Sequence, residues 1–518
     1  MHHLAIPKLY LNHGGIYEIP SMVFSYFPMN LNLLYMIPLY FNNDIVPKYI
    51  HFFFAILTSG AIFLYLRRRI NTLYGLLGVT FFISIPIIIK LSITVYVDLG
   101  VIFFSTASLL LILKWIESGF KARFLILSGV LCGLAVGTKY NGLVTFFLLT
   151  LFVPFLYSRY TQPEKAGVFR PVAHGIFFLF IVISIFSPWM MRNYHWKKNP
   201  IYPLYDRWFN PPQTISGKVI SDNRVKNPNR GFFTFRSLVY HETWWQIALI
   251  PGRIFFQGKD GDPQYFDGKL NPLLLFLPIF AFYRLREDPP IVSREKKIIL
   301  SFAVLFFGFA FFSSVMRIRY ISPIIPPLVI LSVFGVKKMI GIIDNPNKKY
   351  IRHVGITLIF FGMSFFFMLN ADYIIDQFRY VTPFKYINGT VSREEYIERY
   401  RPEYAAMEYI NKNLPSDACI SFIFLGKRGY YCNRRYILGE SQLGHIIQKS
   451  NNPQGISIRL KNLGITHLLI NDYFFERWVN DNFNQEKKEV LKEFFIKHVK
   501  LLFSKSGYSL LYLNNLSS

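Results

Sequence analysis

Charged residues are scarce in this 518-residue chain, and acidic ones are the scarcest. Only 17% of the residues are Asp, Glu, Lys or Arg, against about 25% in soluble domains. Hydrophobic residues make up 52% of the chain and aromatic residues 18%. A chain built only of soluble domains is therefore excluded, and long apolar runs point to a polytopic α-helical membrane protein.

Cysteine is also rare, and it says little about the fold. Of the three cysteines, Cys132 lies in an apolar run. Cys419 and Cys432 lie in the polar C-terminal part, where they can pair if that part faces an oxidising compartment.

Several familiar motifs are missing as well. The chain has no phosphate-binding glycine loop, no HExxH motif, no paired-cysteine metal site and no arginine-rich RNA-binding signature. The first 25 residues lack a basic stretch followed by an apolar core, so we expect no cleavable signal peptide. The net charge of +27 comes largely from residues that flank apolar runs. That pattern favours contact with a lipid bilayer over a nucleic-acid partner.

Apolar runs predict about ten or eleven helical spans, since a span needs about 20 mainly apolar residues. Two glycines, a charge and an amide at 137–142 divide one long apolar run into two spans. The predicted spans are 29–43 (short), 47–66, 72–90, 98–116, 123–138, 140–157, 172–190, 270–284, 297–315, 320–341 and 352–371.

Basic residues in the short loops predict the orientation of these spans. They recur after every second span, so they fall on one side, which we expect to be cytoplasmic. The groups are Arg67, Arg68 and Arg69; Lys121 and Arg123; Arg159, Lys165 and Arg170; Arg284, Arg286, Arg294, Lys296 and Lys297; and Lys337, Lys338, Lys348, Lys349 and Arg352. This predicts a multi-pass protein of the plasma or inner membrane.

Two long polar parts fall on the opposite, outer side. Segment 191–269 is rich in Pro, Gly, Asn and Trp, and its apolar stretch 238–256 can form an interfacial helix. We therefore predict a membrane domain at 1–371, which includes this loop. Residues 372–518 are predicted to form a small extracytoplasmic α/β domain.

The expected elements of the C-terminal domain alternate between helix and strand. The helix over 392–413 is preceded by a capping-box pattern, with Ser392 at the N-cap and Glu395 three residues later. The remaining predictions are strands 418–425 and 465–471, helices 454–463 and 474–498, and a hairpin of 499–505 with 508–514.

Charged residues at span ends are candidate site residues, although each has an ordinary structural explanation. Asp98 can begin a helix as its N-cap, or help to position a substrate or metal. Lys139 can be an interfacial lysine or bind phosphate. Arg317 and Arg319 can grip a phosphate or pyrophosphate bidentately. Arg192 can be an anchor in the aromatic belt or a phosphate ligand.

Four stretches resemble a known family in their order and spacing. They are HLAIPKLYLNHGGI (3–16) with FPMNLNLLY (27–35); VYVDLGVIFF (95–104); GVLCGLAVGTKYNGL (129–143); and SPWMMRNYHWKKNPIYP (187–203), which is followed by FDGKLNPLLLFLPI (266–279) and RIRYISPIIPP (317–327). This arrangement is similar to that of the C-type-fold membrane glycosyltransferases, which include protein O-mannosyltransferases and the aminoarabinose transferase of lipid A.

The resemblance implies a C-type glycosyltransferase fold and transfer of a sugar from a polyprenyl-phosphate carrier at the outer face of the membrane. Asp98 matches the family's second acidic position, and it is the catalytic candidate. Arg317 and Arg319 resemble the stretch that holds the lipid phosphate, Lys139 belongs to a recurrent Thr-Lys turn, and Arg192 completes the candidate phosphate-binding set. A divalent cation can assist, and the acceptor can be a lipid, a glycan or a protein.

The family pattern also places a helix and a general-base carboxylate just before the stretch that matches His3. In the sequence printed here that position precedes Met1, and His2 and His3 are the only ionisable side chains nearby. We expect either a misplaced start or a degenerate, non-catalytic relative. A flippase, transporter or assembly scaffold for lipid-linked sugars is the remaining alternative, although no internal repeat supports transport.

Overall fold

The structure is a computed structural model, and its chain divides into two compact units. One unit is Tyr26–Gln377, and the other combines Met1–Ser25 with Phe378–Ser518. The structure describes residues 2–161, 167, 169–211, 214–215, 218–219, 232–311, 316–343, 349–426 and 428–514. Each unit is considered by itself below.

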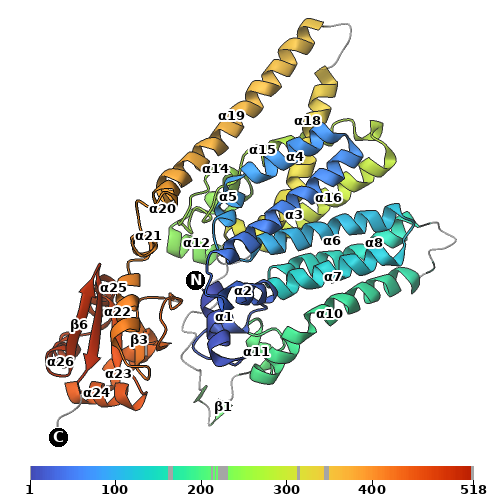
Figure 1. The fold of residues 1–518 in the computed structure, drawn as a ribbon. Coiled ribbons are helices and arrows are strands. Elements are labelled where there is room, and N and C mark those ends of the chain that lie inside the picture. The colour runs from blue at the N-terminus through green and yellow to red at the C-terminus, as the bar shows by residue number, and fades with distance from the viewer. Residues whose placement is uncertain are drawn as a thin grey trace. The chain divides into compact units, whose positions relative to one another are not determined.

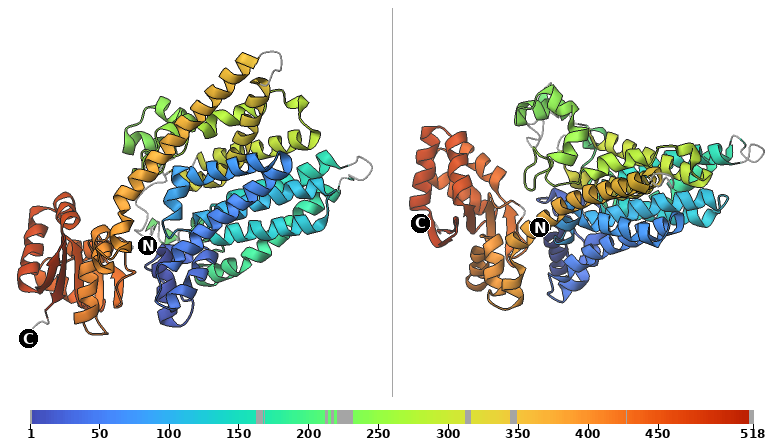
Figure 2. Two further views of the ribbon diagram at one scale, coloured as in Figure 1. Left: turned by 45° about the horizontal axis from the view of Figure 1, so that its top comes forward. Right: turned by 90° about the horizontal axis from the view of Figure 1, so that it is seen from above.

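The unit Tyr26–Gln377 is a bundle of long helices (Figure 1). Both views in Figure 2 show α3, α6, α7, α8 and α10 running side by side, and these helices pack against one another in pairs. The helices are α2 (Asn30–Tyr40), α3 (Val46–Arg69), α4 (Thr72–Ser84), α5 (Pro86–Ser92), α6 (Asp98–Glu117), α7 (Ala122–Thr138), α8 (Gly142–Tyr160), α10 (Phe169–Lys197), α15 (Leu273–Phe280), α16 (Pro290–Phe311), α17 (Ile318–Ile321), α18 (Ile325–Ile343) and α19 (Lys349–Val381).

Six helices of the described residues are long and apolar enough to cross a membrane, or seven if α4 and α5 form one span. The last two are bent by 69° at a break, where Pro86 opens α5. A multi-pass membrane protein is thus confirmed, but four of the eleven expected spans, at α2, α7, α15 and α16, are not among these helices. Helix α2 has 11 residues and α15 has 8. At 1.5 Å per residue they reach only about 17 and 12 Å, well short of a bilayer core.

Ion pairs join several of the predicted cytoplasmic ends at one end of the bundle. Arg69 at the end of α3 forms ion pairs with Glu117 of α6 and with the buried Glu295 of α16. Lys338 of α18 and Lys296 of α16 share Asp288 at 2.9 and 2.6 Å. The structure therefore brings together helix ends that the basic residues predict to lie on one side of the membrane. Lys165, Lys348 and the end of the predicted span 297–315 lie outside the described residues.

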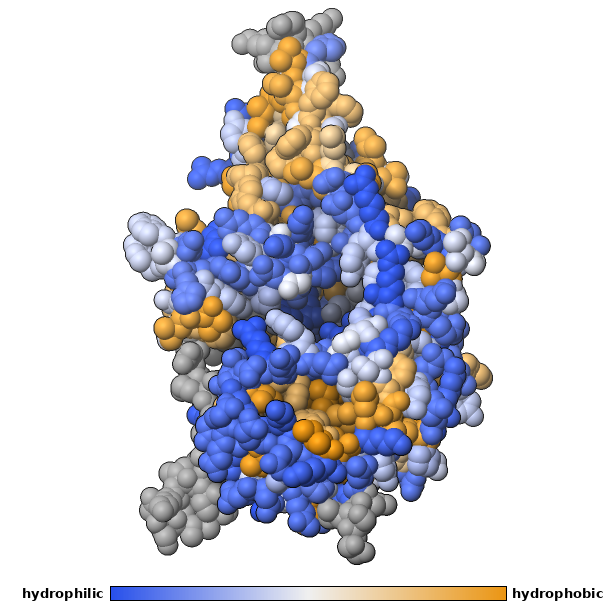
Figure 3. Space-filling model, turned by 90° about the vertical axis from the view of Figure 1, so that its left-hand side faces the viewer, coloured by the Kyte–Doolittle hydropathy of each residue, from blue (hydrophilic) through white to orange (hydrophobic). Residues whose placement is uncertain are grey.

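Helix α19 exposes most of its apolar surface. Only 6% of its most apolar stretch is buried within the structure, and Leu358, Phe360 and Phe361 are all exposed. Figure 3 shows this apolar surface as an orange band near the top, in contrast to the mainly hydrophilic C-terminal unit. A helix that is apolar on nearly all sides is stable in contact with lipid rather than with water.

The predicted outer segment contains several short elements rather than one interfacial helix. Residues 238–256 fall in three helices that are interrupted at His241–Thr243 and Leu249. The elements are α11 (Asp206–Phe209), a two-stranded ribbon of β1 (Thr214–Ile215) and β2 (Lys218–Val219), α12 (Phe232–Tyr240), α13 (Trp244–Ala248) and α14 (Ile250–Phe256).

The second unit contains a five-stranded mixed sheet with the strand order β4-β3-β5-β7-β6. The strands β3, β4 and β5 are parallel, and the hairpin of β6 and β7 runs antiparallel to them. The strands are β3 (Cys419–Ile423), β4 (Arg435–Leu438), β5 (His467–Asn471), β6 (Val499–Lys505) and β7 (Tyr508–Leu513). The small C-terminal sheet domain is confirmed, including the hairpin around Ser506 and Gly507.

Helices pack around this sheet and enclose two hydrophobic cores. Two predicted helices are each broken: Pro402 follows the first part of one, and Asn484 caps a new start in the other. The helices that contribute to these cores are α22 (Tyr404–Asn413), α23 (Glu440–Lys449), α24 (Pro453–Asn462), α25 (Asp472–Asn482) and α26 (Gln485–Lys497). The unit also contains α1 (His2–His13), α20 (Pro383–Ile387) and α21 (Arg393–Tyr400), and short 3-10 turns occur at η1 (Val23–Tyr26), η2 (Leu285–Glu287) and η3 (Ser322–Ile324).

The cysteines do not form a disulfide. Cys132, Cys419 and Cys432 are all free and buried. Burial raises the pKa of the Cys432 thiol to about 11, so the thiol stays protonated at neutral pH.

Candidate active site

Asp98 and Lys139 form a buried ion pair between two neighbouring helices. Asp98 is the first residue of α6, and Lys139 directly follows the last residue of α7. The Lys139 Nζ lies 2.6 Å from Asp98 Oδ1, and the two side chains are 18% and 3% exposed. The carboxylate also lies at the N-terminus of α6, where the helix dipole favours a negative charge.

Arg319 brings a second cation to this pair from α17. Its guanidinium lies over the rings of Tyr96 and Tyr320, 5.0 and 5.3 Å from their centroids, and its charge acts on Asp98. Lys139 Nζ lies 5.0 Å from the same Tyr320 ring. The Tyr320 carbonyl accepts a hydrogen bond of 3.1 Å from Asn141 Nδ2, which ties the α7–α8 turn to α17.

Two polar atoms of this cluster are buried without a hydrogen-bond partner among the described residues. They are Asp98 Oδ2 and Arg319 Nε. Leaving such atoms unpaired costs about 1–3 kcal/mol each, so their partners are expected from a ligand or from water. The cluster has two cations and one carboxylate, which leaves a net positive charge available for an anion such as phosphate.

Arg317 has a different partner, although it is only two residues from Arg319. Its Nη1 lies 3.2 Å from Asp267 Oδ2, and Lys90 Nζ lies 3.1 Å from Asp267 Oδ1. Burial acts to raise the pKa of Asp267, but Lys90, the Gly261 N–H and Arg317 outweigh it, and the pKa is lowered. The adjacent Ile318 N–H donates to the Phe266 carbonyl at 2.8 Å.

Arg192 belongs to a separate cluster at the end of α10. Its guanidinium lies between the rings of Trp189 and Trp196, at 4.6 and 5.0 Å. It also donates to the Phe27 carbonyl and to Asn193 Oδ1. Of the predicted site residues, the structure therefore brings Asp98, Lys139 and Arg319 together, but places Arg317 and Arg192 with other partners.

A buried charge cluster secures the loop that carries Asp267. Glu242 accepts hydrogen bonds from Arg236 Nε at 2.5 Å and from Arg253 Nη2 at 3.0 Å. Arg236 also donates to the Gln264 carbonyl. Burial acts to raise the pKa of Glu242, but the two arginines outweigh it and the pKa is lowered. These contacts link α12, α14 and the loop that precedes α15.

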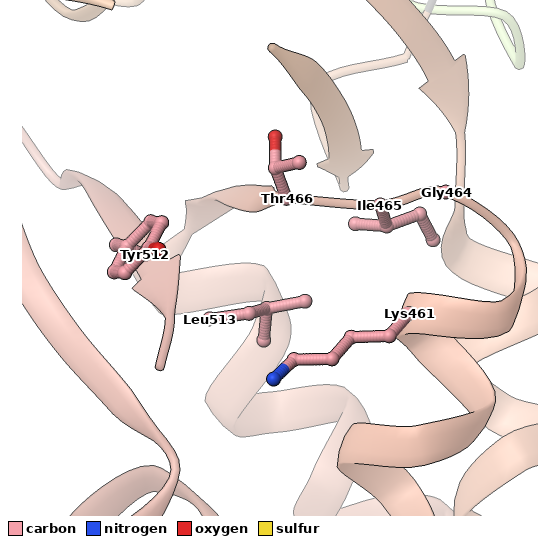
Figure 4. Close-up of a pocket in the computed structure, with 6 residues that line it drawn as sticks. All are labelled: Lys461, Gly464, Ile465, Thr466, Tyr512 and Leu513. Atoms are coloured by element: carbon pink, nitrogen blue, oxygen red, sulfur yellow. The ribbon is translucent and has the colours of Figure 1, made fainter. Parts of the chain in front are cut away.

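Within the residues that the structure describes, no metal site lies beside the candidate residues. The described residues contain no group of three or more His, Cys, Asp or Glu side chains that could hold a metal, and Lys139 already occupies the cation position beside Asp98. A divalent cation therefore stays a prediction. A cavity of about 170 Å³ in the C-terminal sheet domain (Figure 4) is lined by Lys461, Gly464, Ile465, Thr466, Tyr512 and Leu513. It includes none of the predicted site residues.

A model of the dolichyl-phosphate-mannose-protein mannosyltransferase family matches residues 19–196. This range includes Asp98, Lys139 and Arg192. A search of curated protein sequences gives no match.

Solved structures match over nearly the whole chain. ArnT from Cupriavidus metallidurans bound to undecaprenyl phosphate has a TM-score of 0.55 at 15% identity, with 99% of this chain and 93% of that chain covered. The oligosaccharyltransferase AglB from Archaeoglobus fulgidus, in complex with an inhibitory peptide and a dolichol-phosphate, has a TM-score of 0.51 at 11% identity, with 99% and 70% covered.

The chain has the C-type membrane glycosyltransferase fold. The predicted resemblance and fold class are thereby confirmed, including the sheet domain that follows the helices in the sequence. In this C-type fold, α6, α7 and α17 supply the candidate cluster from well-separated parts of the sequence.

Tyr96, Tyr320 and Asp267 contact the candidate residues, and His51 bonds to Leu99, the residue after Asp98. All four are missing from the sequence-based candidates. A signal was available for His51, because a histidine inside an apolar span is a functional candidate by default. The signal is weaker for the others, since tyrosines and aspartates are ordinary residues at membrane interfaces and in loops.

Proposed function

We propose that this protein transfers a sugar from a polyprenyl-phosphate carrier to an acceptor at the end of the helical bundle that carries Asp98. The single observation behind this proposal is the Asp98–Lys139–Arg319 cluster on a C-type fold. The matched ArnT structure holds undecaprenyl phosphate, and the matched AglB structure holds a dolichol-phosphate. Both ligands have the chemistry that an anion-binding cluster at a membrane surface would recognise.

The proposed reaction is a displacement at the anomeric carbon of the sugar. The bond between this carbon and the phosphate oxygen breaks, and its electron pair leaves with the polyprenyl phosphate. The acceptor hydroxyl forms the new bond on the opposite face, which inverts the anomeric configuration. Its proton passes to the surrounding water. Positive charge placed around the leaving phosphate lowers the barrier, because it stabilises charge that grows in the transition state.

Each residue of the cluster has a proposed part in this reaction. Arg319 and Lys139 contact the leaving phosphate, for which Arg319 has a buried Nε without a partner among the described residues. Asp98 holds Lys139 through Oδ1. Its other oxygen, Oδ2, is able to accept a hydrogen bond from the incoming acceptor or from the sugar. Because Asp98 is buried, substrate entry requires a local opening of the cluster.

The proposal also covers the sugar, the acceptor and the side of the membrane on which transfer occurs. The sugar is a hexose or a pentose, and the acceptor is a lipid, a glycan or a protein. We place the cluster and the C-terminal sheet domain on the outer side of the plasma or inner membrane. The basic residues at the opposite end of the bundle support this placement, since short cytoplasmic loops are enriched in Lys and Arg.

Donor turnover by the full chain in nanodiscs tests the proposal. The protein is incubated with a panel of polyprenyl-phosphate hexoses and pentoses, each with a lipid, a glycan and a peptide acceptor. Release of polyprenyl phosphate is followed by mass spectrometry. Turnover of one donor that Arg319→Ala abolishes supports the proposal. Turnover of none of these donors, by protein that is folded and monodisperse, contradicts it.

A further inference from the structure

The helix that presents Asp98 lacks a cap from its own sequence. Val97 stands at the N-cap position of α6 and provides no side-chain hydrogen bond. The first N–H groups of a helix have no partners within the helix, so they need an acceptor from elsewhere. For Leu99, the residue after Asp98, this acceptor is His51 on α3: the Leu99 N–H donates to His51 Nε2 at 3.0 Å.

The two hydrogen bonds of His51 determine its tautomer. Its Nδ1 lies 2.9 Å from the Thr94 carbonyl oxygen. A carbonyl oxygen can only accept, so Nδ1 carries the hydrogen. A backbone N–H can only donate, so Nε2 carries none. The ring is therefore neutral and connects Thr94 with Leu99, on the two sides of the turn that leads into α6.

The His51 ring is buried, and the segment to which it bonds is itself held by hydrogen bonds. The residue is 0% exposed, and the Thr94 hydroxyl donates to the carbonyls of Lys90 and Leu91. Loss of the imidazole acceptor would leave the Leu99 N–H buried and unpaired. The first turn of α6 would then shift or fray, and Asp98 would shift with it.

We propose that His51 is a positioning residue for sugar transfer, which fixes the backbone beneath Asp98 while Lys139 fixes its carboxylate. This inference rests on the proposed function. His51 makes no hydrogen bond to Asp98 Oδ2, and its Nε2 bonds to the backbone of α6 instead. A displacement of about 1 Å at a reacting group can cost about a hundredfold in rate, and His51 controls a displacement of this kind.

The experiment compares His51→Leu with His51→Gln in the full chain in nanodiscs, using the polyprenyl-phosphate sugar that the wild type turns over. Leucine removes the acceptor, whereas the glutamine Oε1 reaches the position of Nε2 and can accept from Leu99. We expect kcat to fall about ten- to a hundredfold in the leucine variant, with the donor KM changed less than threefold. Glutamine should restore most of kcat. Thr58→Val is the matched control on α3, because Thr58 is equally buried but bonds only within its own helix.

The possible outcomes separate this inference from the proposed function. A wild type without turnover contradicts the proposed function and the positioning role with it. An active wild type with an equally active leucine variant overturns the positioning role alone. Equal losses in the leucine and glutamine variants also overturn it, because they show that only the shape of the imidazole matters. If the leucine variant does not fold, His51→Asn replaces it, because its shorter amide cannot reach the Leu99 N–H.

Discussion

Lys139 Nζ lies 2.6 Å from Asp98 Oδ1, although the two residues are 41 positions apart in the chain. The contact joins the end of α7 to the start of α6, the two helices that the short turn around Gly119 connects at their other ends. A buried pair of this kind is costly to break from one side, because the remaining charge stays in a medium of low polarity.

Removal of one partner of this pair should therefore destabilise the fold, and removal of both should do so less. We expect Lys139→Met to lower the free energy of unfolding by about 3–5 kcal/mol. The double variant Lys139→Met with Asp98→Asn should recover part of this loss but no activity. Thermal denaturation in detergent, followed by the fluorescence of the tryptophans, measures the first effect and donor turnover the second. A double variant less stable than Lys139→Met would contradict the pairing.

Arg317 and Arg319 should differ in their effects on turnover. Arg319 faces Asp98, whereas Arg317 pairs with Asp267. We expect Arg319→Ala to lower kcat at least a hundredfold, in line with the loss of one group that stabilises the transition state. Arg317→Ala should instead lower the stability of the neighbouring loop and reduce kcat about tenfold or less. Equal losses of kcat at equal stability would show that both arginines contact the phosphate.

Glu242 should be required for the structure of the outer segment. Glu242→Gln leaves Arg236 buried without its counter-charge, so we expect a local destabilisation of about 3–5 kcal/mol. Amide hydrogen exchange over residues 232–271 measures it. Glu287→Gln is the matched control, since the pair of Arg284 with Glu287 is more than 60% exposed at both ends. It should change stability by less than about 1 kcal/mol.

Asp267 should make the loop around it sensitive to acid. Its pKa is lowered in the folded state, so its contribution to stability is fully present above the unfolded pKa. The contribution is lost as the pH falls through the folded pKa, below about pH 4. We expect amide exchange over residues 257–271 to rise in this range. Asp267→Asn should show faster exchange at pH 7 and a smaller further rise in acid, whereas Asp262→Asn should resemble the wild type.

The cysteines should be unreactive in the folded protein and reactive after unfolding. All three are buried and free, and burial raises the pKa of Cys432 to about 11, so little thiolate is present at pH 7.5. We expect iodoacetamide to label none of them in the native state and all three in denaturant without a reductant. Labelling of Cys419 and Cys432 only after reduction would reveal a disulfide.

Much of the fold follows from patterns that are local in the sequence. Apolar runs locate the long helices, and Ser392 with Glu395 forms the expected capping box. Strand β4 and helix α23 are missing from the prediction, because the four residues Arg435–Leu438 are only partly buried and lack a clear alternation. The two expected spans at α2 and α15 fail for the opposite reason: their sequences are apolar, but Pro38 and Pro278 stand near the ends of short helices.

The candidate site is less predictable, since its contacts depend on packing between distant helices. The sequence indicates Asp98, Lys139 and Arg319 separately but not the ion pair between the first two. Arg317 and Arg319 are only two positions apart in the sequence, but residues two apart at the start of a helix do not share a face. Asp267 and His51 are brought to the site only by the tertiary structure. The loop that contains Asp267 packs against α17, and the packing of α3 against α6 brings His51 to Leu99.

The most direct test of the central claim is the release of polyprenyl phosphate from a polyprenyl-phosphate sugar by the purified chain in nanodiscs, with Asp98→Asn measured beside it. The account predicts acceptor-dependent release by the wild type and a loss of at least a hundredfold in the variant. Asparagine keeps the shape of the side chain but leaves Lys139 without its counter-charge, so the comparison is made with variant protein that thermal denaturation shows to be folded. Equal release by both proteins would contradict the proposed site, and the absence of release by the folded wild type would contradict the proposed function.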